Sequence, residues 1–193
     1  MTSNIWRDFT LLLVMAFFVM VIWMLPHLNP PAQEEREEPP GNLIVHIAWP
    51  EGNTDVDLWL DAPGGGRPVG YSNKSGVVWN LLRDDTGTTG DPLDLNFENA
   101  YTRGIPPGEY IFNLHCYSCP VSPVPIMMEI KIKSPDGDKG SKPLLVVKVE
   151  LARQGEEITA VRFKLDQSHN IIEGTMNHFY EPLREITAPR LGR

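Results

Sequence analysis

The chain has 193 residues, with 17 Lys and Arg against 25 Asp and Glu, which gives a formal net charge of −8. An acidic chain is poorly suited to the phosphate backbone of nucleic acid, so no nucleic-acid partner is expected. Its 16 glycines and 18 prolines, with 9% aromatic residues, indicate a turn-rich β protein rather than a helical one.

An apolar segment near the start of the sequence is long enough to cross a membrane. Across residues 9–25 Thr10 is the single polar side chain. As an α-helix this stretch is roughly 25 Å long, and residues 5–8 extend it to the ~30 Å of a bilayer core. Trp6 and Trp23 stand at its two ends, where interfacial aromatic residues are common. We therefore predict a transmembrane helix over residues 1–26.

The flanks of this helix bear on its orientation and fate. Arg7 precedes it, whereas residues 34–38 contain four glutamates and one arginine, which favours a cytoplasmic N-terminus. A cleaved signal peptide is the alternative. However, the apolar run exceeds the usual 7–15 residues, an acid precedes it, and no A-x-A site follows it. We expect a single-pass anchor in a bacterial inner membrane, with the rest of the chain in the periplasm.

Asp8 lies at or just inside the hydrocarbon boundary if residues 5–25 span the bilayer. A carboxylate there is costly, by about 2.5–3.5 kcal/mol at mid-bilayer and less near the ends. Two interpretations are open. Asp8 sits in the headgroup layer beside Arg7, or it faces a protein partner and carries ions.

The order Asp8-Phe9, then a run rich in Met, Ala and Phe, then Trp23, resembles the single helix of flagellar stator B subunits of the MotB kind. It is similar, more loosely, to the helices of the transport-energising subunits ExbD and TolR. The resemblance covers residues 1–26. It implies that Asp8 carries a proton or sodium ion, and that two copies sit inside a pentamer of a multi-span A-type membrane subunit. Thr10 is a further candidate ligand for sodium.

A linker rich in Pro and Glu is predicted over residues 27–41. Prolines end the helix and favour extended polyproline conformation, and the glutamates repel one another. If it is fully extended, this linker holds the next domain roughly 50 Å from the membrane. Flagellar stator subunits often have a plug helix here, which the prolines of this chain disfavour.

An all-β antiparallel sandwich, of the jelly-roll or immunoglobulin-like kind, is predicted over residues 42–165. Short alternating segments separated by Gly, Pro, Asn and Asp support this prediction. The nine candidate strands are residues 42–49, 55–61, 69–72, 77–82, 93–97, 109–117, 126–133, 144–151 and 158–165. Period-two alternation places these residues in or near the core: Val56, Leu58, Leu60, Tyr110, Phe112 and Leu114. Residues 166–193 form a C-terminal extension, of which residues 171–183 are expected to dock on the sandwich.

Five short motifs occur in order within this domain. They are Asp55-Val56-Asp57-Leu58, Ser72-Asn73, Arg83-Asp84-Asp85, Glu98-Asn99-Ala100 and Pro106-Pro107-Gly108-Glu109-Tyr110. Together they resemble a bacterial β-sandwich domain of uncharacterised function found in exported proteins. The resemblance covers residues 43–117 and implies a fold, not an activity.

Four acids in these motifs form a candidate metal site. Asp55 and Asp57 point to the same side of a strand, and Asp84 and Asp85 begin a loop. Oxygen ligands from a strand and loops suit Ca²⁺, which takes 6–8 of them. The alternative is that these acids cap turns and bind no metal. Their spacing matches no EF-hand or RTX pattern.

Cys116 and Cys119 are the two cysteines of the chain. A turn ahead of Pro120 would bring them together, and in an exported domain a small structural disulfide is expected. Pro120 occupies the position where haem attachment needs His, and nothing supplies the helix of a thioredoxin-like site. The five histidines show no metal-ligand spacing and no catalytic motif appears, so we expect no enzyme.

Two functions of different classes remain. In the first, the chain is the ion-conducting B subunit of a rotary-type motor complex, whose β domain grips an unknown envelope partner. The peptidoglycan-binding domain of flagellar stators has no counterpart here, so the load differs from theirs. In the alternative, the helix merely anchors an extracytoplasmic binding module with no ion transport.

Overall fold

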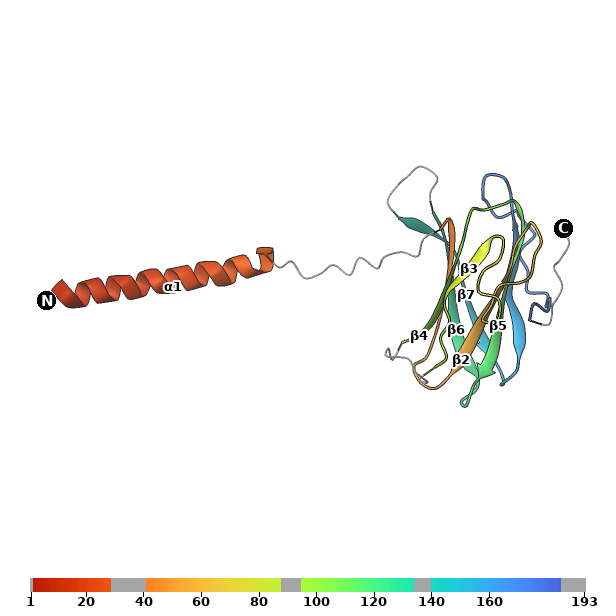
Figure 1. The fold of residues 1–193 in the computed structure, drawn as a ribbon, viewed down its shortest axis with the longest axis horizontal. Coiled ribbons are helices and arrows are strands. Elements are labelled where there is room, and N and C mark those ends of the chain that lie inside the picture. Colours follow the sequence, from red (N-terminus) through yellow and green to blue (C-terminus); the bar gives the residue numbers. More distant parts are fainter. Residues whose placement is uncertain (1, 29–40, 88–94, 134–139, 185–193) are drawn as a thin grey trace. The chain divides into compact units, whose positions relative to one another are not determined.

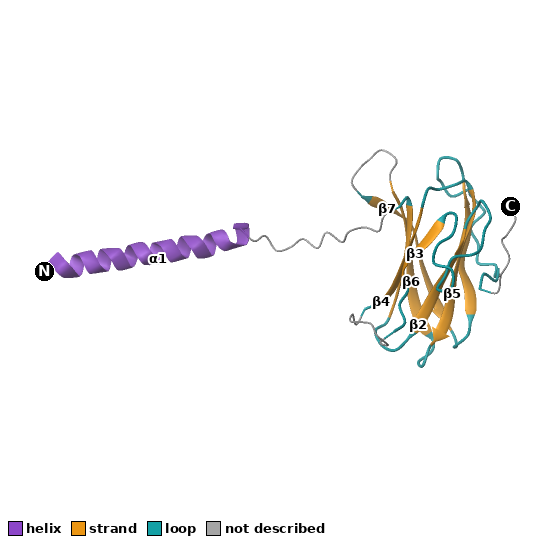
Figure 2. Ribbon diagram, in the orientation of Figure 1, coloured by secondary structure: helices purple, strands orange, loops and turns teal. Residues whose placement is uncertain are grey.

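The computed structural model describes residues 2–28, 41–87, 95–133 and 140–184. The chain divides into two compact units, Met1–Glu38 and Pro39–Arg193. The first contains a helix and the second is built from β-strands (Figures 1 and 2).

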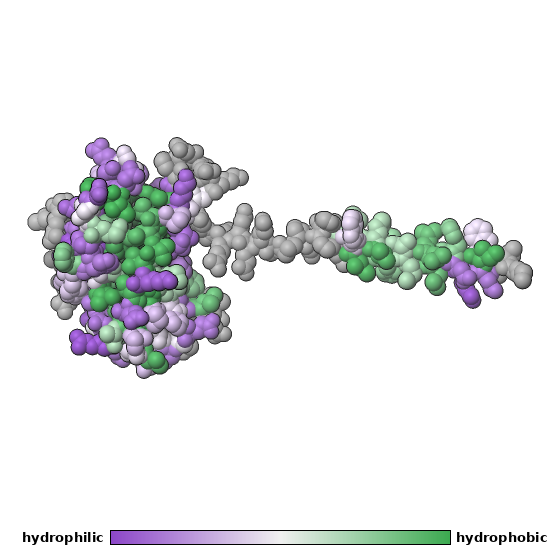
Figure 3. All heavy atoms as spheres, turned by 180° about the vertical axis from the view of Figure 1, so that it is seen from behind, coloured by the Kyte–Doolittle hydropathy of each residue, from purple (hydrophilic) through white to green (hydrophobic). Residues whose placement is uncertain are grey.

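The first unit contains α1, Thr2–Leu28. Its segment Asn4–Met24 is long and apolar enough to cross a membrane, and none of that window is buried against other parts of the structure. Figure 3 shows apolar residues along most of the helix, with hydrophilic ones near its N-terminal end. The helix continues two residues past Pro26, so it ends later than predicted. Pro26 lacks the backbone N–H that would bond to the preceding turn, and the helix ends two residues later, at Leu28.

Eight strands form two antiparallel sheets in the described part of the second unit. The first sheet has the order β3-β4-β1-β6-β7 and the second has the order β2-β5-β8. Their bounds are β1 Leu43–Trp49, β2 Asp55–Asp61, β3 Trp79–Arg83, β4 Asn96–Thr102, β5 Gly108–Ser118, β6 Val124–Lys133, β7 Ser141–Leu151 and β8 Glu157–Leu165.

One hydrophobic core joins the two sheets. The six predicted core residues on β2 and β5 are all fully buried, which confirms that prediction. Trp79 from β3 packs edge-on against Tyr110 and Phe112, and Phe163 from β8 stacks on both of these rings. Fully burying an aromatic or aliphatic side chain contributes about 1.5–3 kcal/mol. The aromatic contacts therefore tie one sheet to the other.

The Pro-Pro-Gly-Glu-Tyr motif forms the entry to β5. Gly108 has a φ of +135°, and a Cβ there would lie 2.7 Å from the ring of Pro63. The Tyr110 hydroxyl donates a hydrogen bond to the Pro106 carbonyl at 2.8 Å. The ring can therefore be buried while its polar end stays bonded to the turn that precedes it.

Two predicted strands differ most from those in the structure, while the others agree to within three residues at each end. Residues 69–72 form isolated bridges, Leu60 with Val69 and Gly70 with Asn73, rather than a strand. A Cβ at Gly70 would lie 2.5 Å from the ring of Trp59, so this segment passes directly over that ring. β4 begins at Asn96, later than the predicted 93–97, and residues 93 and 94 lie outside the described residues. Most of the predicted linker and the end of the predicted C-terminal extension also lie outside them.

The segment after β8 packs back on the second sheet, as expected for residues 171–183. Asn177 exchanges two backbone hydrogen bonds with Arg162 of β8. Leu183 is fully buried in a small cluster with Trp59 and Ile111. This segment brings Arg184 to the face of β2 and β5 that points away from the first sheet.

Candidate functional site

Alternation along β2 places two acids on the outer face of the second sheet. Val56 and Leu58 enter the core, so Asp55 and Asp57 point the other way. Both acids are nevertheless buried, at 9% and 3% exposure. Asp57 lies opposite His115 of β5 in the strand register, and its Oδ2 is 2.7 Å from the His115 Nδ1.

Glu98 brings a third buried acid to the same place from the other sheet. It shares the inward face of β4 with Ala100 and is 0% exposed. Its carboxylate accepts backbone hydrogen bonds from Leu58 at 2.8 Å and from Asp85 at 3.4 Å. Glu98 thus binds the free edge of β2, where a backbone donor would otherwise lack a partner.

Three carboxylates converge at this edge. Oxygen atoms of Asp57, Asp84 and Glu98 all lie within 4.8 Å of one another. Asp84 is also paired with Lys74 at 2.8 Å, at the more exposed side of the group. We call these three residues the acidic cluster. Beside it, the Oδ1 atom of Asp55 is buried without a hydrogen-bond partner.

Asp85, the fourth predicted ligand, does not join the acidic cluster. Its Oδ2 accepts hydrogen bonds from the Arg83 guanidinium and the Phe97 backbone, both at 3.0 Å. Its Oδ1 accepts one from the Gly87 backbone at 2.9 Å. Both oxygens are therefore used in closing the loop after β3, as the turn-capping alternative describes.

Burial and mutual repulsion raise the pKa values of the clustered acids. Burial, followed by the charges of Asp57, Asp84 and Asp85, raises the pKa of Asp55 to about 7. Burial also raises the pKa of Asp57, although its hydrogen bond to His115 opposes this. Complete burial raises the pKa of Glu98 well above its ordinary value, and the backbone bond from Leu58 only partly opposes this. Negative charge here is incompletely compensated.

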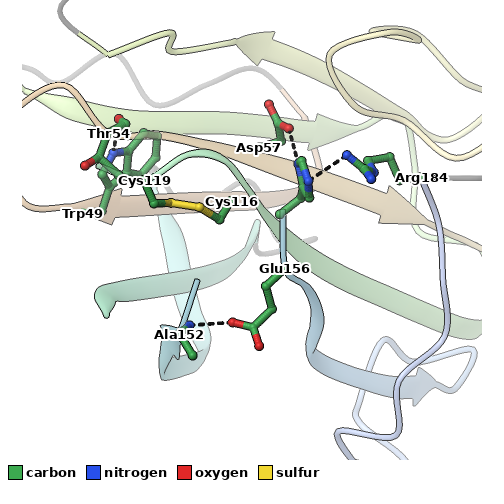
Figure 4. The surroundings of a disulfide bond; sticks show 9 residues. Trp49, Thr54, Asp57, Cys116, Cys119, Ala152, Glu156 and Arg184 are labelled. Carbon is green, nitrogen blue, oxygen red and sulfur yellow. Dashed lines mark hydrogen bonds and ion pairs between the residues drawn. A yellow bond between two sulfur atoms is a disulfide. The ribbon is translucent and has the colours of Figure 1, made fainter. Parts of the chain in front are cut away.

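A chain of polar contacts orients Asp57 (Figure 4). The Arg184 guanidinium lies 2.7 Å from the Nε2 of His115, and Arg can only donate, so this nitrogen accepts. The ring proton is then on Nδ1 and is donated to Asp57. In this arrangement His115 is neutral and donates to Asp57. Both ring nitrogens are occupied, so His115 positions the carboxylate and is not a ligand itself.

Cys116 and Cys119 form a disulfide at the end of β5. Both are buried, and Cys116 directly follows His115 in the chain. Figure 4 shows the disulfide apart from the side chains of Asp57 and Arg184. It closes the turn at this end of the strand.

The two candidate ion-carrying residues lie in the first unit. Asp8 is 3.6 Å from Arg7, and both side chains are exposed. The Thr10 hydroxyl lies 3.0 Å from the Trp6 carbonyl and 2.9 Å from that of Arg7. Residues two apart on a helix point in different directions. One copy of the chain therefore does not bring Asp8 and Thr10 together.

Sequence reasoning missed Glu98 as a ligand candidate, although it named the motif that contains it, and missed His115 and Arg184 entirely. An acid on the inward face of a strand is the signal that was available for Glu98. No local signal exists for His115 and Arg184. The register of β2 with β5 brings His115 to Asp57, and the segment after β8 brings Arg184 to His115.

These features define a chain with one apolar N-terminal helix and an antiparallel β domain that carries a buried acidic cluster. Comparison with protein-family models, curated proteins and solved structures finds no significant match.

Proposed function

We propose that this chain is the ion-carrying B-type subunit of a rotary-type, ion-driven membrane motor complex, with Asp8 as the residue that binds and releases the ion. The supporting observation is that Asp8 lies inside the candidate span Asn4–Met24 rather than before it. A carboxylate on a spanning helix is costly, and such residues usually mark ion pathways.

The proposal requires partners in the membrane. The Asp8 side chain is 71% exposed on its helix, and its ion pair with Arg7 is equally open. In lipid an isolated helix would leave this carboxylate facing hydrocarbon. We therefore propose two copies of the chain inside a pentameric, multi-span A-type subunit. The transported ion is H⁺ or Na⁺, and two copies are needed before Thr10 of one helix can approach Asp8 of the other.

The remaining assignments follow from this arrangement. The helix is placed in a bacterial inner membrane with its N-terminus in the cytoplasm, and the β domain acts on an envelope partner in the periplasm. The domain itself is proposed to be a jelly-roll or immunoglobulin-like sandwich. The bond from the Tyr110 hydroxyl to the Pro106 carbonyl resembles the tyrosine corner of immunoglobulin-like domains and supports the second kind.

Ion flux through the reconstituted complex tests the proposal. The chain is co-expressed and co-purified with a candidate multi-span A-type subunit and placed in vesicles, and H⁺ and Na⁺ entry are measured under an applied potential. Asp8→Asn should reduce flux to the background of empty vesicles, because the amide cannot cycle between charged and neutral forms. Co-purification should be unchanged, since the two side chains have nearly the same shape.

Asp8→Glu is the matched control, because it keeps the carboxylate and should retain flux. Full flux in Asp8→Asn would refute the proposal. It would also favour the second candidate, a membrane-anchored extracytoplasmic binding module without ion transport.

The observation that supports this second candidate is the acidic cluster, which lies in the β domain rather than on the helix. Buried charge is costly unless it is paired or binds a ligand, so the cluster favours a binding role for this domain.

A further inference from the structure

The acidic cluster contains more negative charge than its neighbours neutralise. Its three carboxylates and those of Asp55 and Asp85 are five acids within one network. In the described residues, the bases recorded beside them are Lys74 on Asp84, Arg83 on Asp85 and Arg184 near Asp57. His115 is neutral by the hydrogen-bond argument above. If all five acids are ionised, the three bases leave a net charge of −2, which one divalent cation would neutralise.

A second observation is independent of that count. The Asp55 side chain is 9% exposed, and its Oδ1 is buried with no hydrogen-bond partner. It lies on the same face of β2 as Asp57, two residues along the strand. Buried polar atoms in proteins are almost always bonded, so an orphan oxygen beside three converging oxygens indicates a missing ligand.

We propose that Asp57, Asp84 and Glu98 bind a calcium ion, with Asp55 completing the site directly or through water. Each donor is a hard carboxylate oxygen, and the one nearby imidazole has both nitrogens occupied. Such a set suits Ca²⁺ or Mg²⁺ rather than zinc or copper. Ca²⁺ is favoured because carboxylates held by backbone and strand geometry form an irregular shell, whereas Mg²⁺ demands a near-ideal octahedron.

The surroundings fit a site whose ligands are held in place. Asp57 is fixed by His115 and Arg184, and Glu98 is fixed by two backbone donors. Hydrogen bonds of this kind orient metal-binding carboxylates in known sites. Asp84 is at the rim, where Lys74 occupies one of its oxygens, so the ion would enter from this side and share the carboxylate with the lysine.

Calcium titration of the full chain in detergent micelles tests the inference. After treatment with EDTA and its removal, binding is measured by calorimetry and the melting temperature by tryptophan fluorescence. Ca²⁺ should bind one ion per chain and raise the melting temperature, and Mg²⁺ at equal concentration should raise it less. No shift with Ca²⁺ would overturn the proposal, and an equal shift with Mg²⁺ would overturn the choice of calcium.

Glu98→Gln separates binding of the ion from a purely structural role. The amide oxygen still accepts the Leu58 hydrogen bond, while the longer 3.4 Å bond from the Asp85 backbone is lost. An amide also costs less to bury than a carboxylate, which offsets that loss. In EDTA this variant should melt no lower than the wild type, yet it should bind Ca²⁺ at least about 10-fold more weakly. Asp84→Asn, at the more exposed rim, should weaken binding similarly and provides a second variant if Glu98→Gln does not fold.

Glu129→Gln is the matched control, because Glu129 lies on β6, pairs with Lys131 and is not part of the acidic cluster. It should leave calcium binding unchanged. Wild-type affinity in both Glu98→Gln and Asp84→Asn would refute the assigned site. Asp8→Asn should also bind calcium normally, so failure of this inference and failure of the proposed ion-carrying function give different results.

Discussion

Replacing Gly108 by alanine tests how the turn before β5 holds Tyr110 in the core. At φ +135° a non-glycine residue is strained by about 1–3 kcal/mol. The new Cβ would also lie 2.7 Å and 2.9 Å from two ring carbons of Pro63, and such overpacking costs about 1–3 kcal/mol. Alanine restricts the unfolded chain and returns about 0.4–1 kcal/mol. The expected loss in the free energy of unfolding is therefore about 1–6 kcal/mol.

Gly52→Ala is the matched control for the backbone part of this loss. Gly52 has a similar φ of +128°, but a Cβ there would meet no atom within 4 Å. The two variants share the conformational cost, so their difference isolates the contact with Pro63, at about 1–3 kcal/mol.

Urea unfolding of the chain in detergent micelles measures both variants. It is followed by tryptophan fluorescence, to which the buried Trp49, Trp59 and Trp79 of the β domain contribute. Equal losses would show that Gly108 does not lie against Pro63. A Gly108→Ala variant as stable as the wild type would refute the backbone argument as well.

Two further predictions concern the site and the segment that covers it. In EDTA the free energy of unfolding should fall as pH rises from about 4 to about 7, because Asp55, Asp57 and Glu98 bind protons more tightly when folded. Asp55→Asn should reduce the size of this fall. The prediction would be contradicted if the free energy of unfolding of the wild type rose between pH 4 and pH 7, and if Asp55→Asn showed the same pH dependence as the wild type. Glu157 accepts hydrogen bonds from Asn113 and the Leu183 backbone through one oxygen, so Glu157→Ala, which removes that acceptor, should cost about 1–3 kcal/mol. Faster hydrogen exchange at Leu183 would show this, and unchanged exchange would refute it.

Alternation predicted the strands whose two faces differ most in polarity. β2 has the predicted bounds, and its inward residues Val56, Leu58 and Leu60 are fully buried. The hydrophobic effect is sufficient for such segments, because a shift of one residue would expose the whole apolar set. The strand predicted at residues 93–97 was placed too early, because Asn96 and Glu98 of β4 are polar residues that nevertheless face inward. Their burial depends on partners that local pattern does not reveal.

The candidate site was predictable only in part for the same reason. Asp57 was identified because its strand alternates clearly, and Asp84 because it lies beside a loop. Asp85 was grouped with it as a neighbour in sequence, but the two carboxylates have different partners in the structure. The contact of Asp57 with His115 joins residues 58 apart, and that of Arg184 with His115 joins residues 69 apart. Only the strand register and the return of the chain after β8 create them.

The placement of these contacts links the acidic cluster to folding of the whole β domain. Glu98 comes from the first sheet and binds the edge of the second through Leu58. Arg184 comes from the last described segment, which Glu157 holds against β8 and β5. The carboxylates can converge only when both sheets are in place, and the last segment then helps to position Asp57 through His115. Their repulsion then opposes folding, and a bound cation removes it, so the free energy of cation binding adds to the stability of the folded domain.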